Sequence, residues 1–248
     1  MKVSSTELQN NFGKYLMLAA KEDIIVMRNG TEVAVLSAKK DADPYSGATE
    51  PPGMVREVMT KGNYGGWKAS YQEFLDLVTD NDEQQYEYID GEIYLMGSPK
   101  VKHQKALTEL LGLFFNWFKG KKCQPFVAPF DITLRRFPED INVVQPDIMV
   151  ICDLEEKLNA NDYYMGIPAL VVEILSEGTR SKDLAKKLDL YMSCGIKEYW
   201  IVNPIKKEVT VHLLADGDIS DSTTYKKGEI IKSFHFEGLQ VELDLIFN

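Results

Sequence analysis

The chain has 248 residues, of which 44% are hydrophobic and 27% are charged, and it carries a formal net charge of −10. This composition is typical of an ordinary globular protein, and the acidic balance excludes a protein that coats nucleic acid by bulk electrostatic attraction. No apolar run reaches the length of a membrane span and the N-terminus lacks a signal-peptide pattern, so we expect a cytoplasmic protein without membrane contact. The sequence contains no Walker loop, GxGxxG motif or nucleophile elbow, and ATP, NAD and serine-hydrolase chemistry therefore have no support.

Three cysteines, Cys123, Cys152 and Cys194, are odd in number and widely spaced, and none forms a CxxC pair. This pattern predicts neither disulfides nor a structural zinc site. Two of the three end apolar stretches, which is typical of small core residues.

Residues 1–40 predict a strand, a helix capped by Ser4 or Ser5, and a hairpin. Asn29-Gly30 is a strong hairpin turn between short strands at residues 24–27 and 32–36. The segment holds six basic and four acidic residues, so it is positive while the rest of the chain is acidic. A unit of this size can hardly bury a core alone, and we expect it to dimerise or to pack on another part.

The sequence VSSTELQNNFGKYL, followed by EDIIVMRNGTEVAVL, resembles the DNA-binding half of Phd/YefM-type antitoxins. The resemblance implies a homodimer that grips operator DNA, with the candidate DNA contacts Lys2, Asn10, Lys14 and Arg28. The alternative is a dimerisation unit with solvated charges, because phosphate binding normally needs several cations. Residues 41–69, rich in Pro and Gly, read as a linker where such antitoxins carry their toxin-binding tail, so a toxin partner has no sequence support.

Ser70 and Glu73 form a capping-box pattern that opens a short helix ending near Leu77. Residues 86–89 and 92–96 predict two strands about the turn Asp90-Gly91. Glu87 and Glu92 in these strands are candidate site acids, although alternating strand carboxylates more often form a solvent-facing side.

A long helix is expected over residues 101–118, and His103 begins its buried stripe, where a histidine is usually a satisfied structural group. Residues 126–136 predict a strand that pairs with residues 142–152. Arg135 and Arg136 are candidate phosphate contacts or ordinary surface charges. Residues 153–166 predict a loop over the cleft.

Residues 169–175 form an apolar run typical of a strand buried on both faces, yet Glu173 lies in its middle. Asp147 stands at the start of a second buried strand. A carboxylate is rarely buried without a partner, and two acids on adjacent central strands suit Mg²⁺ or Mn²⁺. The sequence therefore predicts a hard-oxygen site.

The helix that opens at Arg180 carries Leu184, Leu188 and Tyr191 on one face. Lys187 lies at the edge of that face, whereas Lys186 is expected to point to solvent. Lys187 would either stabilise charge on a phosphate or only neutralise Glu173. Further strands are expected at residues 198–202, 208–214, 226–236 and 239–245.

The order PD, VVEILS, TR, KLDLY and GIKEYWIV resembles the Uma2 (DUF820) family of the PD-(D/E)XK nuclease superfamily. The resemblance implies a restriction-endonuclease-like core with Asp147 and Glu173 as metal ligands, completed by the Ile174 main-chain carbonyl. The plain superfamily motif has a lysine two residues after the second acid, where this chain has Leu175. The family is thought to have moved that lysine to the next helix, which matches Lys187.

These observations predict an α/β protein with a restriction-endonuclease-like mixed central sheet flanked by helices in residues 70–248, preceded by a small α+β antitoxin-like unit. The expected function is a Mg²⁺-dependent endonuclease acting on DNA, with Asp147, Glu173, Lys187 and His103 as catalytic candidates. Arg135 and Arg180, with the N-terminal basic residues, are the expected nucleic-acid contacts. The alternatives are a non-catalytic DNA-binding regulator or antitoxin with a degenerate nuclease fold, favoured by Leu175, and a purely structural buried network.

Overall fold

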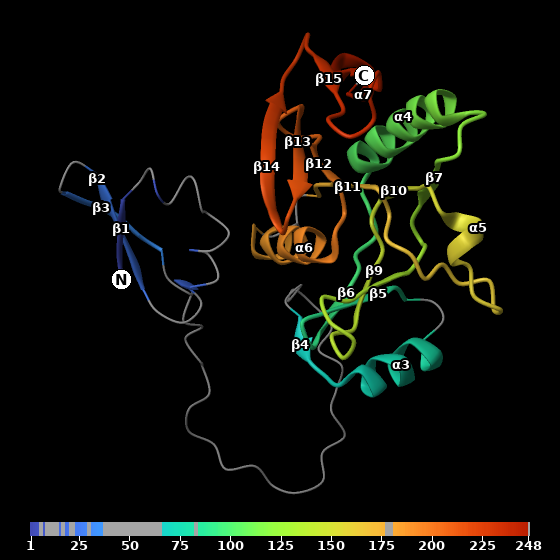
Figure 1. The fold of residues 1–248 in the computed structure, drawn as a ribbon, viewed down its shortest axis with the longest axis horizontal. Helices are drawn as coiled ribbons and strands as arrows, with labels where there is room; N and C mark the ends of the chain where they lie inside the picture. Colours follow the sequence, from blue (N-terminus) through green and yellow to red (C-terminus); the bar gives the residue numbers. More distant parts are fainter. Residues whose placement is uncertain are drawn as a thin grey trace, which may run out of the picture. The chain divides into compact units, whose positions relative to one another are not determined.

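The computed structural model describes residues 1–4, 7, 15, 18–19, 23–28, 31–36, 66–81, 84–176 and 181–247. The chain divides into two compact units, Met1–Gly62 and Asn63–Asn248 (Figure 1). Most of the helix expected near the N-terminus, with Asn10 and Lys14, lies outside the described residues, as do Arg180 and the expected linker up to residue 65. The predicted division at residues 40 and 70 therefore stays a prediction.

The first unit contains a three-stranded sheet of β1 (Lys2–Ser4), β2 (Ile24–Arg28) and β3 (Thr31–Leu36). Strand β1 runs parallel to β2, and β3 pairs antiparallel to β2. Val3, Ile24 and Val26 are buried in its small core. The strand and the hairpin predicted for this segment are confirmed.

The second unit is built around a six-stranded sheet in the order β14-β13-β12-β11-β10-β7. Only β11 and β12 pair in parallel, so the sheet is mixed, as predicted. The bounds are β7 (Gln124–Val127), β10 (Ile148–Ile151), β11 (Leu170–Ile174), β12 (Glu198–Asn203), β13 (Glu208–Ala215) and β14 (Asp218–Tyr225). Strand β14 was not predicted, because its sequence DISDSTTY is polar on an outer edge of the sheet.

Helices α4 (Val101–Phe118) and α6 (Ser181–Cys194) cover opposite faces of this sheet (Figure 1). Leu170, Val172 and Ile174 of β11 pack in one apolar cluster with α4. Val171 packs in the other cluster with α6. Because strand side chains alternate between faces, Glu173 shares the α6 face with Val171. The apolar run of β11 is thus buried on both sides, as expected.

A five-stranded sheet in the order β4-β6-β5-β9-β8 lies next to this core. Its strands are β4 (Trp67–Lys68), β5 (Tyr86–Ile89), β6 (Glu92–Leu95), β8 (Ile132–Leu134) and β9 (Asn142–Val144). The β5–β6 turn has positive φ at both Asp90 and Gly91, which is the hairpin geometry that Asp-Gly favours. Helix α3 (Tyr71–Asp80) opens with the predicted Ser70–Glu73 capping box and runs three residues past the expected end.

Two predicted strands are each divided between the two sheets. Residues 126–136 form β7 and β8, and residues 142–152 form β9 and β10, so β8 pairs with β9 and β7 pairs with β10. Pro129 and Pro146 lie at the two crossings. A proline has no N–H to continue a ladder, which is the physical reason that the strands break there.

The C-terminal part forms the two-stranded sheet of β15 (Ile230–Lys232) and β16 (Gln240–Glu242), followed by α7 (Leu243–Ile246). The strand predicted over residues 239–245 is therefore wrong in its second half, which is helical and packs in the same apolar cluster as α4. Residues 153–166, expected as a loop, contain the short helix α5 (Leu154–Lys157) and a bridge between Leu158 and Tyr164. None of the described helices combines the length and apolar character needed to cross a membrane.

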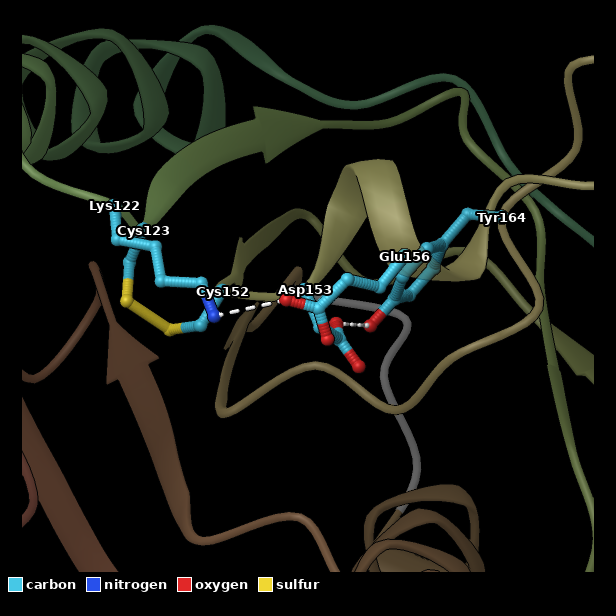
Figure 2. The surroundings of a disulfide bond; sticks show 6 residues. All are labelled: Lys122, Cys123, Cys152, Asp153, Glu156 and Tyr164. Atoms are coloured by element: carbon cyan, nitrogen blue, oxygen red, sulfur yellow. Dashed lines mark hydrogen bonds and ion pairs between the residues drawn. A yellow bond between two sulfur atoms is a disulfide. The ribbon is translucent and has the colours of Figure 1, made fainter.

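A disulfide joins Cys123 and Cys152, contrary to the sequence prediction (Figure 2). The two cysteines lie 29 residues apart in the chain, and spacing alone gave no sign of the bond. The β7–β10 ladder pairs Gln124 with Ile151, so the cysteines occupy the next cross-strand position. Cys194 is free and buried, as expected for a core residue.

Polar contacts surround the disulfide on the α5 side (Figure 2). Lys122 pairs with Glu156 of α5 at 3.1 Å, and the Tyr164 hydroxyl donates to Asp153 at 2.6 Å. The loop after β10 is therefore tied to the residues that precede β7.

Candidate active site

The candidate site lies where the two sheets of the second unit meet. Asp147 stands between β9 of one sheet and β10 of the other, and Glu173 lies in β11. Glu87 comes from β5, Lys187 from α6 and His103 from the first turn of α4. Four elements and the connection between β9 and β10 thus contribute ionisable side chains to one place.

Lys187 joins carboxylates from the two sheets. Its Nζ donates to Glu173 Oε1 at 2.9 Å and to Glu87 Oε1 at 2.8 Å. The Tyr191 hydroxyl, one helical turn further along α6, donates to the same Glu173 oxygen at 2.7 Å. The Lys187, Glu87 and Glu173 side chains are only 11%, 7% and 12% exposed, so these charges interact with little screening by water.

Burial and neighbouring charges shift the protonation equilibria of this cluster. Burial raises the pKa of Glu173 to about 7, Lys187 opposes that shift, and the charges of Asp147 and Glu87 add to it. Burial alone would lower the pKa of Lys187, but Glu173 and Glu87 outweigh it and hold the pKa above its usual range. Lys187 therefore stays protonated at neutral pH, whereas Glu173 binds a proton readily.

Asp147 is fixed by one main-chain and one side-chain contact. The Ile174 N–H donates to Asp147 Oδ2 at 2.7 Å, and His103 Nε2 lies 3.2 Å from the same carboxylate. Since Ile174 directly follows Glu173, this bond brings the two predicted acids together. His103 is 8% exposed, and its Nδ1 is buried with no hydrogen-bond partner in the described part of the chain.

Two further residues border the cluster and were missed in the sequence. The Gln145 main-chain N–H donates to Glu87 Oε1 at 2.9 Å. The Tyr199 hydroxyl is buried without a partner among the described residues, and burial followed by the charges of Glu173, Asp147 and Glu87 raises the pKa of its phenol. The only sign of Tyr199 in the sequence is its place in EYWIV, directly before the tryptophan of a buried strand.

The donor chemistry fits a hard divalent cation in part. Glu87 and Glu173 both pair with Lys187, and the charge of Asp147 acts on Glu173, so the cluster carries excess negative charge when Glu173 is ionised. Both hydrogen bonds to Glu173 fall on Oε1. Within the described residues, no group of three or more His, Cys, Asp or Glu side chains is arranged as a metal site. Mg²⁺ commonly keeps several waters and uses one or two carboxylates, a number that Asp147 and Glu173 can supply.

The family assignment follows from a comparison with protein-family models. The model of Uma2, described as "Putative restriction endonuclease", matches residues 71–245. The chain belongs to the Uma2 family.

The chain is also similar to one known protein in sequence and to one solved structure in fold. The Uma2 chain is 29% identical over 153 residues to the uncharacterized protein slr1290 of Synechocystis sp., covering 61% of this chain and 77% of the relative. It is also similar in fold to the crystal structure of a "putative nuclease belonging to DUF820" from Anabaena variabilis, with a TM-score of 0.54 and 20% identity over 65% of this chain and 89% of that one. Family and fold together support a nuclease, and nucleic acid is the substrate class that this family implies.

Two expectations about charged residues of the Uma2 domain were wrong. Glu87 is 5% exposed because all four residues of β5 are buried in the middle of the five-stranded sheet, so it does not face solvent. Lys186 does not point to solvent either, since its Nζ donates to Glu92 Oε2 and to the Tyr94 hydroxyl, both at 2.6 Å. Helix α6 packs against the β5–β6 hairpin, so Lys186 contacts Glu92 of β6 and Lys187 contacts Glu87 of β5.

The predicted nucleic-acid contacts are spread over the chain. Arg135 is exposed and donates to the Pro138 carbonyl at 2.6 Å. Lys2 is exposed in β1, and Arg28 is the last residue of β2. Their contact with nucleic acid stays a prediction.

Proposed function

We propose that this Uma2 protein is a divalent-metal-dependent endonuclease that hydrolyses phosphodiester bonds of DNA. The observation that carries the proposal is Lys187, a charged ammonium held between Glu173 and Glu87 beside Asp147. A buried cation beside acids from two central strands is suited to the charge of a phosphate in transfer.

Asp147 and Glu173 would hold Mg²⁺ or Mn²⁺, with the Ile174 carbonyl as a further oxygen ligand. When bound, the ion would polarise the phosphate and lower the pKa of an attacking water. Lys187 keeps its proton, so its role is to orient that water and to neutralise a phosphate oxygen, and it does not act as the base. His103 holds the Asp147 carboxylate in position from α4.

The test is cleavage of supercoiled plasmid with Mg²⁺ or Mn²⁺ by the full chain and by Asp147→Asn and Lys187→Met. We expect a loss of about 100-fold or more in each variant, since a single stabilising donor is worth about that much. Lys186→Met is the matched control, because it removes the neighbouring ammonium of α6 and should change the rate by less than about threefold. A wild-type protein that is inert with both metals, or a Lys187→Met variant that cleaves normally, would refute the proposal.

A second candidate is a non-catalytic DNA-binding regulator. It is favoured by the lack, in the described residues, of a three-ligand metal cluster, and by the hydrogen bonds that already engage Lys187. In this case residues 1–40 would bind operator DNA as a homodimer, with no toxin partner required. An inert wild type whose DNA affinity falls in Lys2→Ala and Arg28→Ala, with a smaller salt dependence, would support the regulator.

A further inference from the structure

A groove lies between α4 and β7, the strand at one edge of the six-stranded sheet (Figure 1). Its volume is about 570 Å³, within the range of roughly 300–1,000 Å³ that ligand pockets occupy. Helix α4 lines one side, and β7 with the residues that follow it lines the other. Thr108 carries the only polar side chain in the described lining, so the groove is apolar and largely aromatic.

The two sides of the groove offer flat surfaces and open space. Phe115 of α4 is 59% exposed, so much of its ring is available to a ligand. On the β7 side, the rings of Phe126 and Phe130 lie 5.6 Å apart with 30° between their planes. An aromatic lining of this kind can stack on a nucleic-acid base, because every base has a π-face.

Gly112, one helical turn before Phe115, is a second sign that a ligand approaches α4. A Cβ at this position would meet no atom within 4 Å, so the described packing does not require a glycine. Glycine inside a helix is destabilising relative to alanine. Its presence in the groove is explained if a ring must come close to the helix at that turn.

Exposed lysines flank the α4 side of the groove. Lys105 lies three residues before Thr108, and Lys119 lies four residues after Phe115, spacings that place side chains on the same side of a helix. Glu109 is also exposed, but it lies about 100° around the helix from Thr108. An apolar groove with a cation at each end matches a nucleic-acid strand, whose bases present apolar faces and whose phosphates are anionic.

The groove adjoins the backbone of the candidate active site. The Ala128 N–H donates to the Asp147 main-chain carbonyl at 3.3 Å, and Val127 pairs with Ile148 in the β7–β10 ladder. Val127 and Pro129, the two neighbours of Ala128, both line the groove. A strand with a phosphate at Asp147 therefore reaches the groove within a few nucleotides.

The same edge is poorly suited to a further protein strand. Pro125 and Pro129 have no N–H, and the Ala128 N–H is already bonded to Asp147. Prolines on an edge strand are typical of edges that are protected from pairing with another strand. The groove thus favours a ligand that binds through ring faces over one that binds through backbone hydrogen bonds.

We propose that this groove binds the bases of an unpaired DNA strand by stacking, with phosphates of the same strand at Lys105, at Lys119 and at the candidate active site. The inference rests on the proposed nuclease function and adds its substrate class, which is single-stranded DNA or the unpaired part of a duplex. Stacking uses no base edge, so the groove accepts any sequence.

The test is binding without metal, which is measurable whether or not the protein cleaves DNA. The full chain is titrated in EDTA with an oligothymidylate of about 12 nucleotides, within the usual site sizes of single-strand-binding folds, and with a duplex of the same length. Phe115→Ala should weaken single-strand binding about tenfold, as expected when one stacking ring is lost. Its affinity for the duplex should not change.

Gly112→Leu should weaken single-strand binding at least as much, because the new side chain fills the groove. It should melt no lower than the wild type, since leucine is the better helix former, so unfolding cannot cause the loss. Lys105→Met should reduce the salt slope of single-strand binding by about 0.7, the value for one phosphate contact. Phe137→Ala is the matched control, because Phe137 is 57% exposed and lies outside the groove lining, and it should keep the wild-type affinity.

Unchanged single-strand affinity in Phe115→Ala and Gly112→Leu, or equal losses for single strand and duplex, would overturn the inference even if the plasmid is cleaved. A wild-type dimer that Phe115→Ala dissociates in sedimentation without DNA would assign the groove to a second copy of the chain and would also overturn it. Groove-dependent single-strand binding by a protein that never cleaves would support the groove and refute the nuclease.

Discussion

At the scale of single residues, the site depends on the number of carboxylates that pair with the Lys187 ammonium. Sequence reasoning could nominate Asp147, Glu173 and Lys187, because an acid within an apolar run needs a partner and the next helix supplies a cation at the right face. It missed the burial of Glu87, since the alternation rule assumes that one face of a strand meets water. The burial of β5 depends on β9, whose Val143 pairs with Tyr88 from 55 residues further along the chain (143 − 88), and this pairing cannot be read from the local pattern.

Glu87→Gln tests whether the pairing of Lys187 with two carboxylates contributes to cleavage. Glutamine keeps an acceptor for the Gln145 N–H but removes one of the two charges that orient Lys187, so we expect cleavage to fall about 10- to 100-fold, as for other outer-shell groups. Glu92→Gln, which breaks the parallel Lys186 pair, should change the rate by less than about threefold. Values of kcat/KM for the two variants on one substrate make the comparison. Equal losses would show that the Glu87 contact has no special role.

At the scale of elements, Arg136 links three segments that surround the site. Its guanidinium contacts Asp90 in the β5–β6 turn at 2.8 Å, Asp140 before β9 at 3.1 Å and Asp189 of α6 at 3.2 Å. Asp189 lies two residues after Lys187, so this contact helps to fix the helix that carries the lysine. No sequence pattern predicts this link, because the three carboxylates that pair with Arg136 come from three separate regions of the chain.

Arg136→Met should therefore destabilise the Uma2 domain by about 2 kcal/mol, the size expected for partly buried hydrogen bonds to a charged group. Lys122→Met is the matched control, since the Lys122–Glu156 pair is 71% and 66% exposed and should contribute about 0.5 kcal/mol or less. Urea unfolding of both variants gives the two free-energy changes. A loss in Arg136→Met no larger than in the control would contradict the proposed link.

Most element positions were nevertheless predictable from the sequence. The helix over residues 101–118 and the strands flanking Asp90-Gly91 have their expected bounds to within a residue, because periodicity and turn chemistry are local. The errors at β7–β8 and β9–β10 arose because each pair was predicted as one strand, although the chain crosses from one sheet to the other within it. Sheet membership is a tertiary property, and the prolines at the crossings were the only local sign of it.

At the scale of the whole molecule, the two compact units keep separate cores. The described core cluster of the first unit contains only residues from Val3 to Leu36, and the described clusters of the second contain only residues from Ala69 onward. The family match begins at residue 71. The described apolar clusters of the second unit therefore consist of residues of that unit.

We expect residues 63–248 expressed alone to fold, with a Tm within about 2 °C of the main transition of the full chain, a shift that corresponds to less than about 1 kcal/mol. Calorimetry of both proteins measures this, and plasmid cleavage by the fragment should match that of the full chain. A fragment that aggregates, or that melts well below the intact protein, would show that the first unit supports the second.

The hydrogen bond from the Ile174 amide to Asp147 bears on which substitutions the site tolerates during evolution. Its donor belongs to the polypeptide backbone, so replacing the side chain at position 174 with anything but proline leaves the donor in place. The hydrogen bond that orients Asp147 is therefore kept as long as the backbone of β11 is kept, while the side chains around it are free to diverge.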